Sequence, residues 1–155
     1  MTITLRDELH QRKPFGTPQE EAVLNIVRTG ATLQDSFEQI VKPFGITGSQ
    51  YNVLRILRGA EPEGLCRNAL RDRMLTRMPD VTRLLDRMEE SGLVTRTRDA
   101  DDRRLVSTRI TRQGRRMLDD LDDVVIAHQM RRLGHLDPEQ LRTLSDLLTL
   151  VRQPR

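Results

Sequence analysis

The strongest constraint on the fold is residues 76–116, where three structural patterns follow one another along the chain. Apolar residues over 81–88 recur at the spacing of one helix face, and Gly92 is placed to end that helix. Apolar and polar residues then alternate over 93–98 and again over 105–111, as they do in the two strands of a hairpin. The pattern therefore predicts a short amphipathic helix followed directly by a hairpin.

This hairpin carries charge at its tip and leads into a new helix. The residues between its strands, DADDRR, are too polar to be buried, so they form the exposed end of the hairpin. Thr111 then caps a helix whose apolar residues recur from Met117 to Leu133. A basic hairpin beside an arginine-bearing helix is typical of a DNA-reading helix with a wing, and it indicates binding rather than catalysis.

The composition narrows the class of protein further. The chain has 155 residues, the length of one domain, and its 32% charged and 3% aromatic residues favour a mostly helical fold with an aliphatic core. No apolar run approaches the ~18 residues of a membrane span, and the N-terminus lacks the apolar segment of a secretory signal. A single cysteine, Cys66, excludes an internal disulfide and fits a reducing compartment, so we expect a cytoplasmic protein.

Positive charge is concentrated in the middle of the chain. Residues 67–116 hold 14 arginines against 8 acidic residues, whereas the rest of the chain holds 12 basic and 15 acidic residues. The net charge of +3 therefore hides a basic middle third, as a phosphate-facing surface requires. Nearly all of the basic residues are arginines, whose planar fork suits phosphates and guanine edges, although such a bias can also reflect genome composition.

The two ends of the chain are predicted to be helical. Thr17 caps a long apolar helix over 17–43, with Glu20 closing a capping box, and Thr47 caps a second helix that stops near Gly59. Helical spacing resumes over 112–152, interrupted by a new capping signal at Asp137. The expected fold class is mainly α with a small β-hairpin wing, in one domain of residues 1–155.

A helix-turn-helix is expected before the hairpin. Its first helix carries apolar residues from Leu65 to Met74, and its second begins at Pro79. The turn between the two helices is expected over 75–78. With the hairpin, this makes 47–111 a winged helix-turn-helix DNA-binding region.

The chain resembles the MarR (multiple-antibiotic-resistance regulator) family of bacterial winged helix-turn-helix repressors. The resemblance rests on VTRLLDRMEESGLV (81–94), DADDRRLVSTRIT (99–111) and Gly114, and on the order of elements over most of the chain. It implies an obligate homodimer in which the helices over 17–43 and 112–152 interlock and two winged domains bind one palindrome. It also implies control by oxidation or by a small ligand, often an aromatic acid or a phenol.

The resemblance and the helix geometry together select the residues that contact DNA. Thr82 and Arg83 face outward on the reading helix, where family members touch bases and phosphates. Arg83 can fork onto a guanine, or it can remain solvated and paired with an acidic neighbour, Asp80 or Asp86. At the wing, the resemblance implies that Arg104 enters the minor groove, Arg103 binds phosphate and Asp102 braces the turn. Arg96 and Arg109 can add contacts to the DNA backbone. The candidate DNA-binding residues are Arg77, Pro79, Thr82, Arg83, Arg87, Arg98, Asp102, Arg103 and Arg104.

The remaining candidates are weaker. An effector pocket can be lined by Phe37, Phe44, Tyr51 and Met74, although each of them also fits the core. Cys66 is expected to be packed or inert rather than a redox sensor. The three histidines are not spaced as metal ligands, and we expect no metal, no cofactor and no enzymatic activity.

Two functions remain open at this stage. The first is a transcription regulator, expected to be a repressor, that binds a palindromic operator as a homodimer and is released by a small ligand. The alternative is a winged-helix module for protein contacts or for non-specific DNA scaffolding. The wide apolar faces of the terminal helices suit a partner chain, or else they form an intramolecular helical layer.

Overall fold

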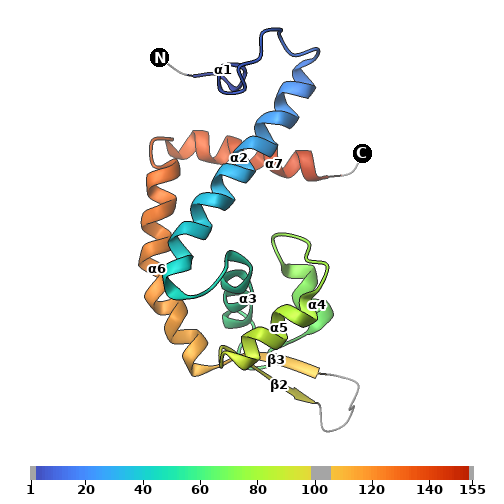
Figure 1. Ribbon diagram of the computed structural model, residues 1–155, viewed down its shortest axis with the longest axis vertical. Helices are drawn as coiled ribbons and strands as arrows, with labels where there is room; N and C mark the ends of the chain where they lie inside the picture. Colours follow the sequence, from blue (N-terminus) through green and yellow to red (C-terminus); the bar gives the residue numbers. More distant parts are fainter. Residues whose placement is uncertain (1–2, 99–105, 154–155) are drawn as a thin grey trace. The chain divides into compact units, whose positions relative to one another are not determined.

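The computed structural model describes residues 3–98 and 106–153, which form two compact units, residues 1–39 and 40–155. Within the described residues the elements are helices α1 to α7 and strands β1 to β3 (Figure 1). The strands form one antiparallel sheet in the order β1-β3-β2. The expected class, mainly α with a small β wing, is confirmed.

The first unit consists of α1 (Leu5–Glu8) and most of α2 (Pro18–Val41). Thr17 caps α2, since its hydroxyl accepts the Glu20 N–H at 3.1 Å. The Glu20 carboxylate accepts the N–H of Gly16 at 2.7 Å, so the reciprocal bond of the capping box falls one residue before the position expected. The helix ends at Val41, and a turn of 3₁₀ helix over Lys42–Phe44 follows.

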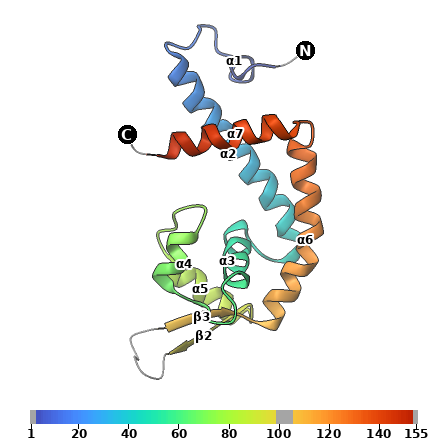
Figure 2. The ribbon, with the colours of Figure 1, turned by 180° about the vertical axis from the view of Figure 1, so that it is seen from behind.

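The second unit has α3 (Gly48–Arg58) as its central helix. Thr47 and Gln50 form the predicted capping box at its start. Tyr51, Val53, Leu54 and Leu57 of α3 are buried and pack with side chains of the other elements of this unit. Figure 2 shows α3 beside α4 (Arg67–Arg73) and α5 (Val81–Glu90), next to the sheet.

The sheet contains one strand that the sequence did not predict. β1 (Leu65–Cys66) pairs with β3 (Val106–Ile110), and β3 also pairs with β2 (Val94–Arg98). The prediction that the first helix of the helix-turn-helix includes Leu65 is therefore wrong, because that helix, α4, begins at Arg67. The two residues of β1 instead cover the open edge of β3, whose backbone groups would otherwise lack partners. Cys66 is exposed and precedes α4, so the thiol is not packed; that it is inert rather than a redox sensor stays a prediction.

The connection between α4 and α5 is longer than expected. α4 ends at Arg73, with Met74 extended at ψ 141°, and α5 begins at Val81. Pro79 therefore does not start the reading helix. Asp80 starts it, because its carboxylate accepts the Arg83 N–H at 2.9 Å and so satisfies one of the free donors of the first turn. Arg77 and Pro79 both lie in the connection, residues 74–80.

Two glycines allow the turn after α5 and the close approach of α6 to the chain that follows α5. Gly92 has φ +73° and ends the turn after α5, as predicted, and the Leu93 N–H donates to the Met88 carbonyl at 2.9 Å. Gly114 lies in the first turn of α6 (Arg112–Leu133), which Thr111 caps as expected. A Cβ on Gly114 would stand 2.4 Å from the Leu93 carbonyl oxygen, so only glycine lets α6 approach the chain this closely.

The last helix, α7 (Pro138–Arg152), starts with the predicted capping box of Asp137 and Gln140. Within its described residues α7 contains no buried side chain. Most of its apolar side chains are instead exposed, namely Leu144, Leu147, Leu150 and Val151, while Leu141 and Leu148 are partly buried.

Candidate nucleic-acid interface

The reading helix α5 has two faces of opposite character. Val81, Leu84, Leu85 and Met88 are buried and fix the helix to the core of its unit. The opposite face carries exposed hydrogen-bonding and positively charged groups, because residues three and four apart lie on the same side of a helix. The candidates Thr82, Arg83 and Arg87 are exposed on α5, as is the acidic Glu90.

Neither of the two expected acidic partners holds the Arg83 side chain. Asp80 binds the backbone N–H of Arg83, and Asp86 binds Arg96 at 2.7 Å. Within the described residues no ion pair involves the Arg83 guanidinium. Arg83 is exposed, and no described residue accepts from its side-chain donors, which a residue that reads a guanine edge needs free.

Thr82 has a neighbour that sequence reasoning missed. Arg67, the first residue of α4, donates from Nη1 to the Thr82 hydroxyl oxygen at 3.1 Å. Both residues are exposed, so a guanidinium lies directly beside the exposed face of α5. The two residues are 15 positions apart, and only the packing of α4 against α5 brings them together; no spacing in the sequence signals it.

Arg96 joins the reading helix to the wing. Its Nη2 atom lies 2.6 Å from Glu89 Oε2 and 2.7 Å from Asp86 Oδ1. The backbone N–H of Arg96 also donates to Glu89 Oε1 at 2.9 Å. Hydrogen bonding to Arg96 lowers the pKa of the Glu89 carboxyl, and the same bonds raise the pKa of Arg96. Nε and Nη2 of the guanidinium are thus bonded to α5, while Nη1 lies outside these bonds, and the expected contact of Arg96 with the DNA backbone stays a prediction.

One candidate DNA-binding residue of the wing lies among the residues that the structure describes. Arg98, at the end of β2, is exposed. Arg109 of β3 donates from Nε to the Glu63 carbonyl at 3.1 Å, which leaves its Nη groups outside that bond. The other predicted wing residues, Asp102, Arg103 and Arg104, lie outside the described residues.

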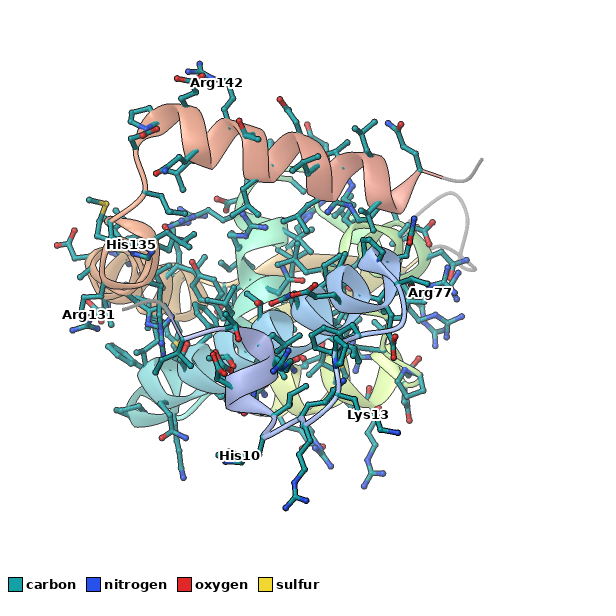
Figure 3. All side chains as sticks on the ribbon, turned by 90° about the horizontal axis from the view of Figure 1, so that it is seen from above. His10, Lys13, Arg77, Arg131, His135 and Arg142 are labelled. Atoms are coloured by element: carbon teal, nitrogen blue, oxygen red, sulfur yellow. The ribbon has the colours of Figure 1, made fainter. Side chains whose placement is uncertain are left out.

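Arg77 and Pro79 are exposed in the connection before α5 (Figure 3 labels Arg77). They are therefore next to the start of the reading helix but not part of it. Leu75 of the same connection donates its N–H to the side chain of Asn52 in α3 at 3.0 Å.

A cavity of about 350 Å³ borders this surface. Arg96 and Thr82, from the wing and the reading helix, lie at its wall, and Leu85 contributes apolar surface. The full lining is Cys66, Arg67, Asn68, Thr82, Leu85, Arg96, Val106 and Thr108.

The four predicted pocket residues do not line this cavity. Tyr51 is buried, and burial raises the pKa of its hydroxyl, while Phe44 and Met74 are partly buried in the same unit. Phe37 is partly buried and belongs to the unit of residues 1–39. A second cavity, of about 520 Å³, is lined by residues between Thr4 and Glu21. An effector site at Phe37, Phe44, Tyr51 and Met74 stays a prediction.

Two other findings concern the described residues only. They contain no cluster of three or more histidine, cysteine or acidic side chains arranged to hold a metal ion. They also contain no helix with both the length and the apolar character needed to cross a membrane.

An arginine-bearing helix fixed by its apolar face, a preceding helix and a basic hairpin together define a winged helix-turn-helix DNA-binding protein. The chain belongs to the MarR family. The model of that family matches residues 44–105, which contain α3, α4, α5 and β2. A MarR transcription factor from Planctomyces limnophilus of known structure is 38% identical, with a TM-score of 0.68, over 88% of this chain and 99% of that one.

Two further relatives extend the comparison. The transcriptional regulator FarR of Neisseria gonorrhoeae is 28% identical over 134 residues, which cover 85% of this chain and 90% of FarR. CouR from Rhodococcus jostii RHA1, in a structure with p-coumaroyl-CoA bound, is 26% identical with a TM-score of 0.75. That match covers 91% of this chain and 98% of CouR. FarR and the Planctomyces limnophilus protein are transcription regulators, a class without enzymatic activity.

Proposed function

We propose that this MarR-family regulator is a homodimeric repressor that binds a palindromic operator and is released by a small ligand. The observation that carries the proposal is the exposed face of α5. Thr82, Arg83 and Arg87 project from a helix whose other face is buried, and Arg83 has no acidic partner within the described residues. Such a helix supplies base contacts and phosphate contacts from one rigid element.

The proposed contacts divide into three groups. Arg83 and Thr82 read base edges in the major groove, and Arg87 binds phosphate. Arg77 and Pro79 approach the DNA backbone from the connection before α5. At the wing, Arg98 and Arg103 bind phosphate, Asp102 braces the turn and Arg104 enters a narrow minor groove.

The proposal of a homodimer is supported by apolar surface on the terminal helices. α7 buries no described side chain, yet Leu147, Leu150 and Val151 are each more than half exposed. Val23 and Val27 of α2 are exposed to a similar extent. Contiguous exposed apolar side chains on a helix mark a surface that a partner covers. A second copy of the chain would place two α5 helices about 34 Å apart, one turn of DNA.

The proposed effector is a small aromatic or phenolic molecule. Support comes from the similar protein CouR, whose structure holds p-coumaroyl-CoA, a coenzyme A thioester that carries a phenolic ring. The candidate lining remains Phe37, Phe44, Tyr51 and Met74, which the sequence predicted.

The test is selection of bound sequences from a pool of random DNA duplexes. The proposal expects one enriched motif with two-fold symmetry and half-sites one helical turn apart. Enrichment of no motif would favour the alternative, a winged-helix module for protein contacts or non-specific DNA scaffolding. An enriched motif without symmetry would contradict the dimer.

A further inference from the structure

Asn52 is a polar residue in the hydrophobic core. Only 6% of it is exposed, and its neighbours Val53 and Leu54 on α3 are completely buried. Its Oδ1 atom accepts the backbone N–H of Leu75 at 3.0 Å. Its Nδ2 group is buried and has no hydrogen-bond partner among the residues that the structure describes.

The orientation of this amide is fixed by Leu75. A backbone N–H can only donate, so the carbonyl oxygen of Asn52 must face Leu75, and the NH₂ group must point away from it. A buried donor without a partner destabilises a fold, whereas a leucine of similar size would not. Asn52 is therefore not the side chain that would make this position most stable, and its bond to Leu75 is the one hydrogen bond of its side chain that is found among the described residues.

Leu75 lies in the connection 74–80, which determines where α5 begins. The Leu75 side chain is 78% exposed, so burial does not hold it in place. The Met74 N–H donates back into α4, and Asp80 bonds forward into α5. Among the hydrogen bonds found in the described residues, only the one between Asn52 and Leu75 joins this connection to a helix other than α4 and α5, namely α3.

We propose that Asn52 is a positioning residue for DNA recognition. Through the Leu75 N–H it fixes the connection, and the connection sets where the first turn of α5 lies relative to α3. Thr82 and Arg83 lie in that first turn, so their donors meet the DNA in one geometry. This inference rests on the proposed operator binding.

The test uses the full-length chain and the duplex selected by the wild type. Asn52→Leu removes both the bond to Leu75 and the unpaired donor. The midpoint of thermal unfolding should change little, because removal of the unpaired Nδ2 donor offsets the loss of the acceptor for the Leu75 N–H. The affinity for the selected duplex should fall by about tenfold, the loss expected for one hydrogen bond of ordinary strength. Hydrogen exchange of the Leu75 amide should become faster.

Two matched variants separate positioning from packing. Asn52→Asp is isosteric and keeps an oxygen facing Leu75, so it should retain affinity within about threefold, while its buried carboxyl lowers the unfolding midpoint. Val53→Ala, at the adjacent buried position, should also lower the midpoint, yet leave the affinity of the folded protein unchanged. We therefore expect the unfolding midpoint and the affinity for DNA to change independently in these variants.

Three outcomes would overturn the inference. The first is wild-type affinity in Asn52→Leu. The second is a parallel loss of stability and affinity in all three variants, which would show a merely structural role. The third is unchanged Leu75 exchange in Asn52→Leu. Because this exchange is measured without DNA, it decides whether Asn52 holds the connection even if the wild type selects no duplex and the proposed function fails.

Discussion

Glu89 in the last turn of α5 binds Arg96 of β2 through both side chain and backbone. Oε2 accepts from Nε at 3.0 Å and from Nη2 at 2.6 Å, while Oε1 accepts the Arg96 backbone N–H at 2.9 Å. One carboxylate thus fixes the rotamer of the arginine and the position of the strand. The reading helix and the wing are thereby held to each other by two charge-assisted bonds to one carboxylate oxygen and a backbone bond to the other.

Replacing Glu89 by alanine should loosen this joint. The pair is partly exposed, so we expect the free energy of unfolding to fall by only about 1 kcal/mol. The affinity for the selected duplex should fall several-fold, because the wing loses its fixed position relative to α5. Urea unfolding and fluorescence anisotropy measure the two effects. Glu90→Ala, at the neighbouring exposed position, is the control and should change neither quantity appreciably; equal effects of the two substitutions would contradict the role of the Glu89–Arg96 pair.

The same contact predicts a dependence of stability on pH. The pKa of Glu89 is lowered from 4.5 in the folded state, chiefly by its hydrogen bonds with Arg96. A depressed carboxyl pKa stabilises the fold above the unfolded value, and this stabilisation is lost as pH falls through the folded value. The difference in unfolding free energy between wild type and Glu89→Gln should therefore be constant near neutral pH and shrink below about pH 4.5. A difference that grows on acidification would contradict the assignment.

Arg83→Ala should relax sequence specificity. If Arg83 forks onto one guanine in each half-site, its loss removes about 1–3 kcal/mol of discrimination against the other bases at that position. Binding to duplexes that carry each substitution at each position measures the effect. Arg87→Ala is the control, since loss of a phosphate contact weakens all sequences alike and lowers the salt dependence of binding. A uniform loss with Arg83→Ala would assign Arg83 to phosphate.

At the wing, Arg104→Ala should weaken binding most for sites flanked by A·T pairs. A narrow minor groove concentrates negative potential, which an inserted arginine neutralises. Paired measurements on duplexes with A·T-rich and G·C-rich flanks check this. Equal losses on both duplexes would place Arg104 on the phosphates instead, and no loss would remove it from the interface.

Gly114→Ala should destabilise the fold, because the new methyl group would lie 2.4 Å from the Leu93 carbonyl oxygen. Such overpacking costs about 1–3 kcal/mol. Gly30 offers a matched control in α2, since a Cβ there would meet nothing within 4 Å. Gly30→Ala should instead stabilise by up to about 1 kcal/mol through helix propensity. Thermal unfolding of the two variants should give shifts of opposite sign, and a neutral Gly114→Ala would contradict the close packing.

Local signals in the sequence predicted most of the elements. The capping residues Thr47, Thr111 and Asp137 start helices where expected, and Gly92 takes the left-handed conformation. Such signals act over three or four residues, so they can be recognised without knowledge of the fold.

Two differences are local, since α5 is capped by Asp80 rather than begun by Pro79, and Glu20 bonds to Gly16 rather than to Thr17. The other errors and omissions involve contacts that depend on how the elements pack. β1 forms because β3 offers an open edge, and Leu65 and Cys66 alone are too short to show strand alternation. The contact of Arg67 with Thr82 and that of Asn52 with Leu75 depend on how α3, α4 and α5 pack. The ion pairs of Arg96 with Asp86 and Glu89 were also missed, because they form only once the wing packs against α5.

The central claim, site-specific binding by a dimer, is tested most directly by equilibrium titration of the selected duplex and of a scrambled duplex with the same base composition. At physiological salt, the selected duplex should bind at least about 10³-fold more tightly. Two chains should bind each duplex, and the affinity should fall steeply as salt rises. Equal affinity for both duplexes, or one chain per duplex at saturation, would contradict the account.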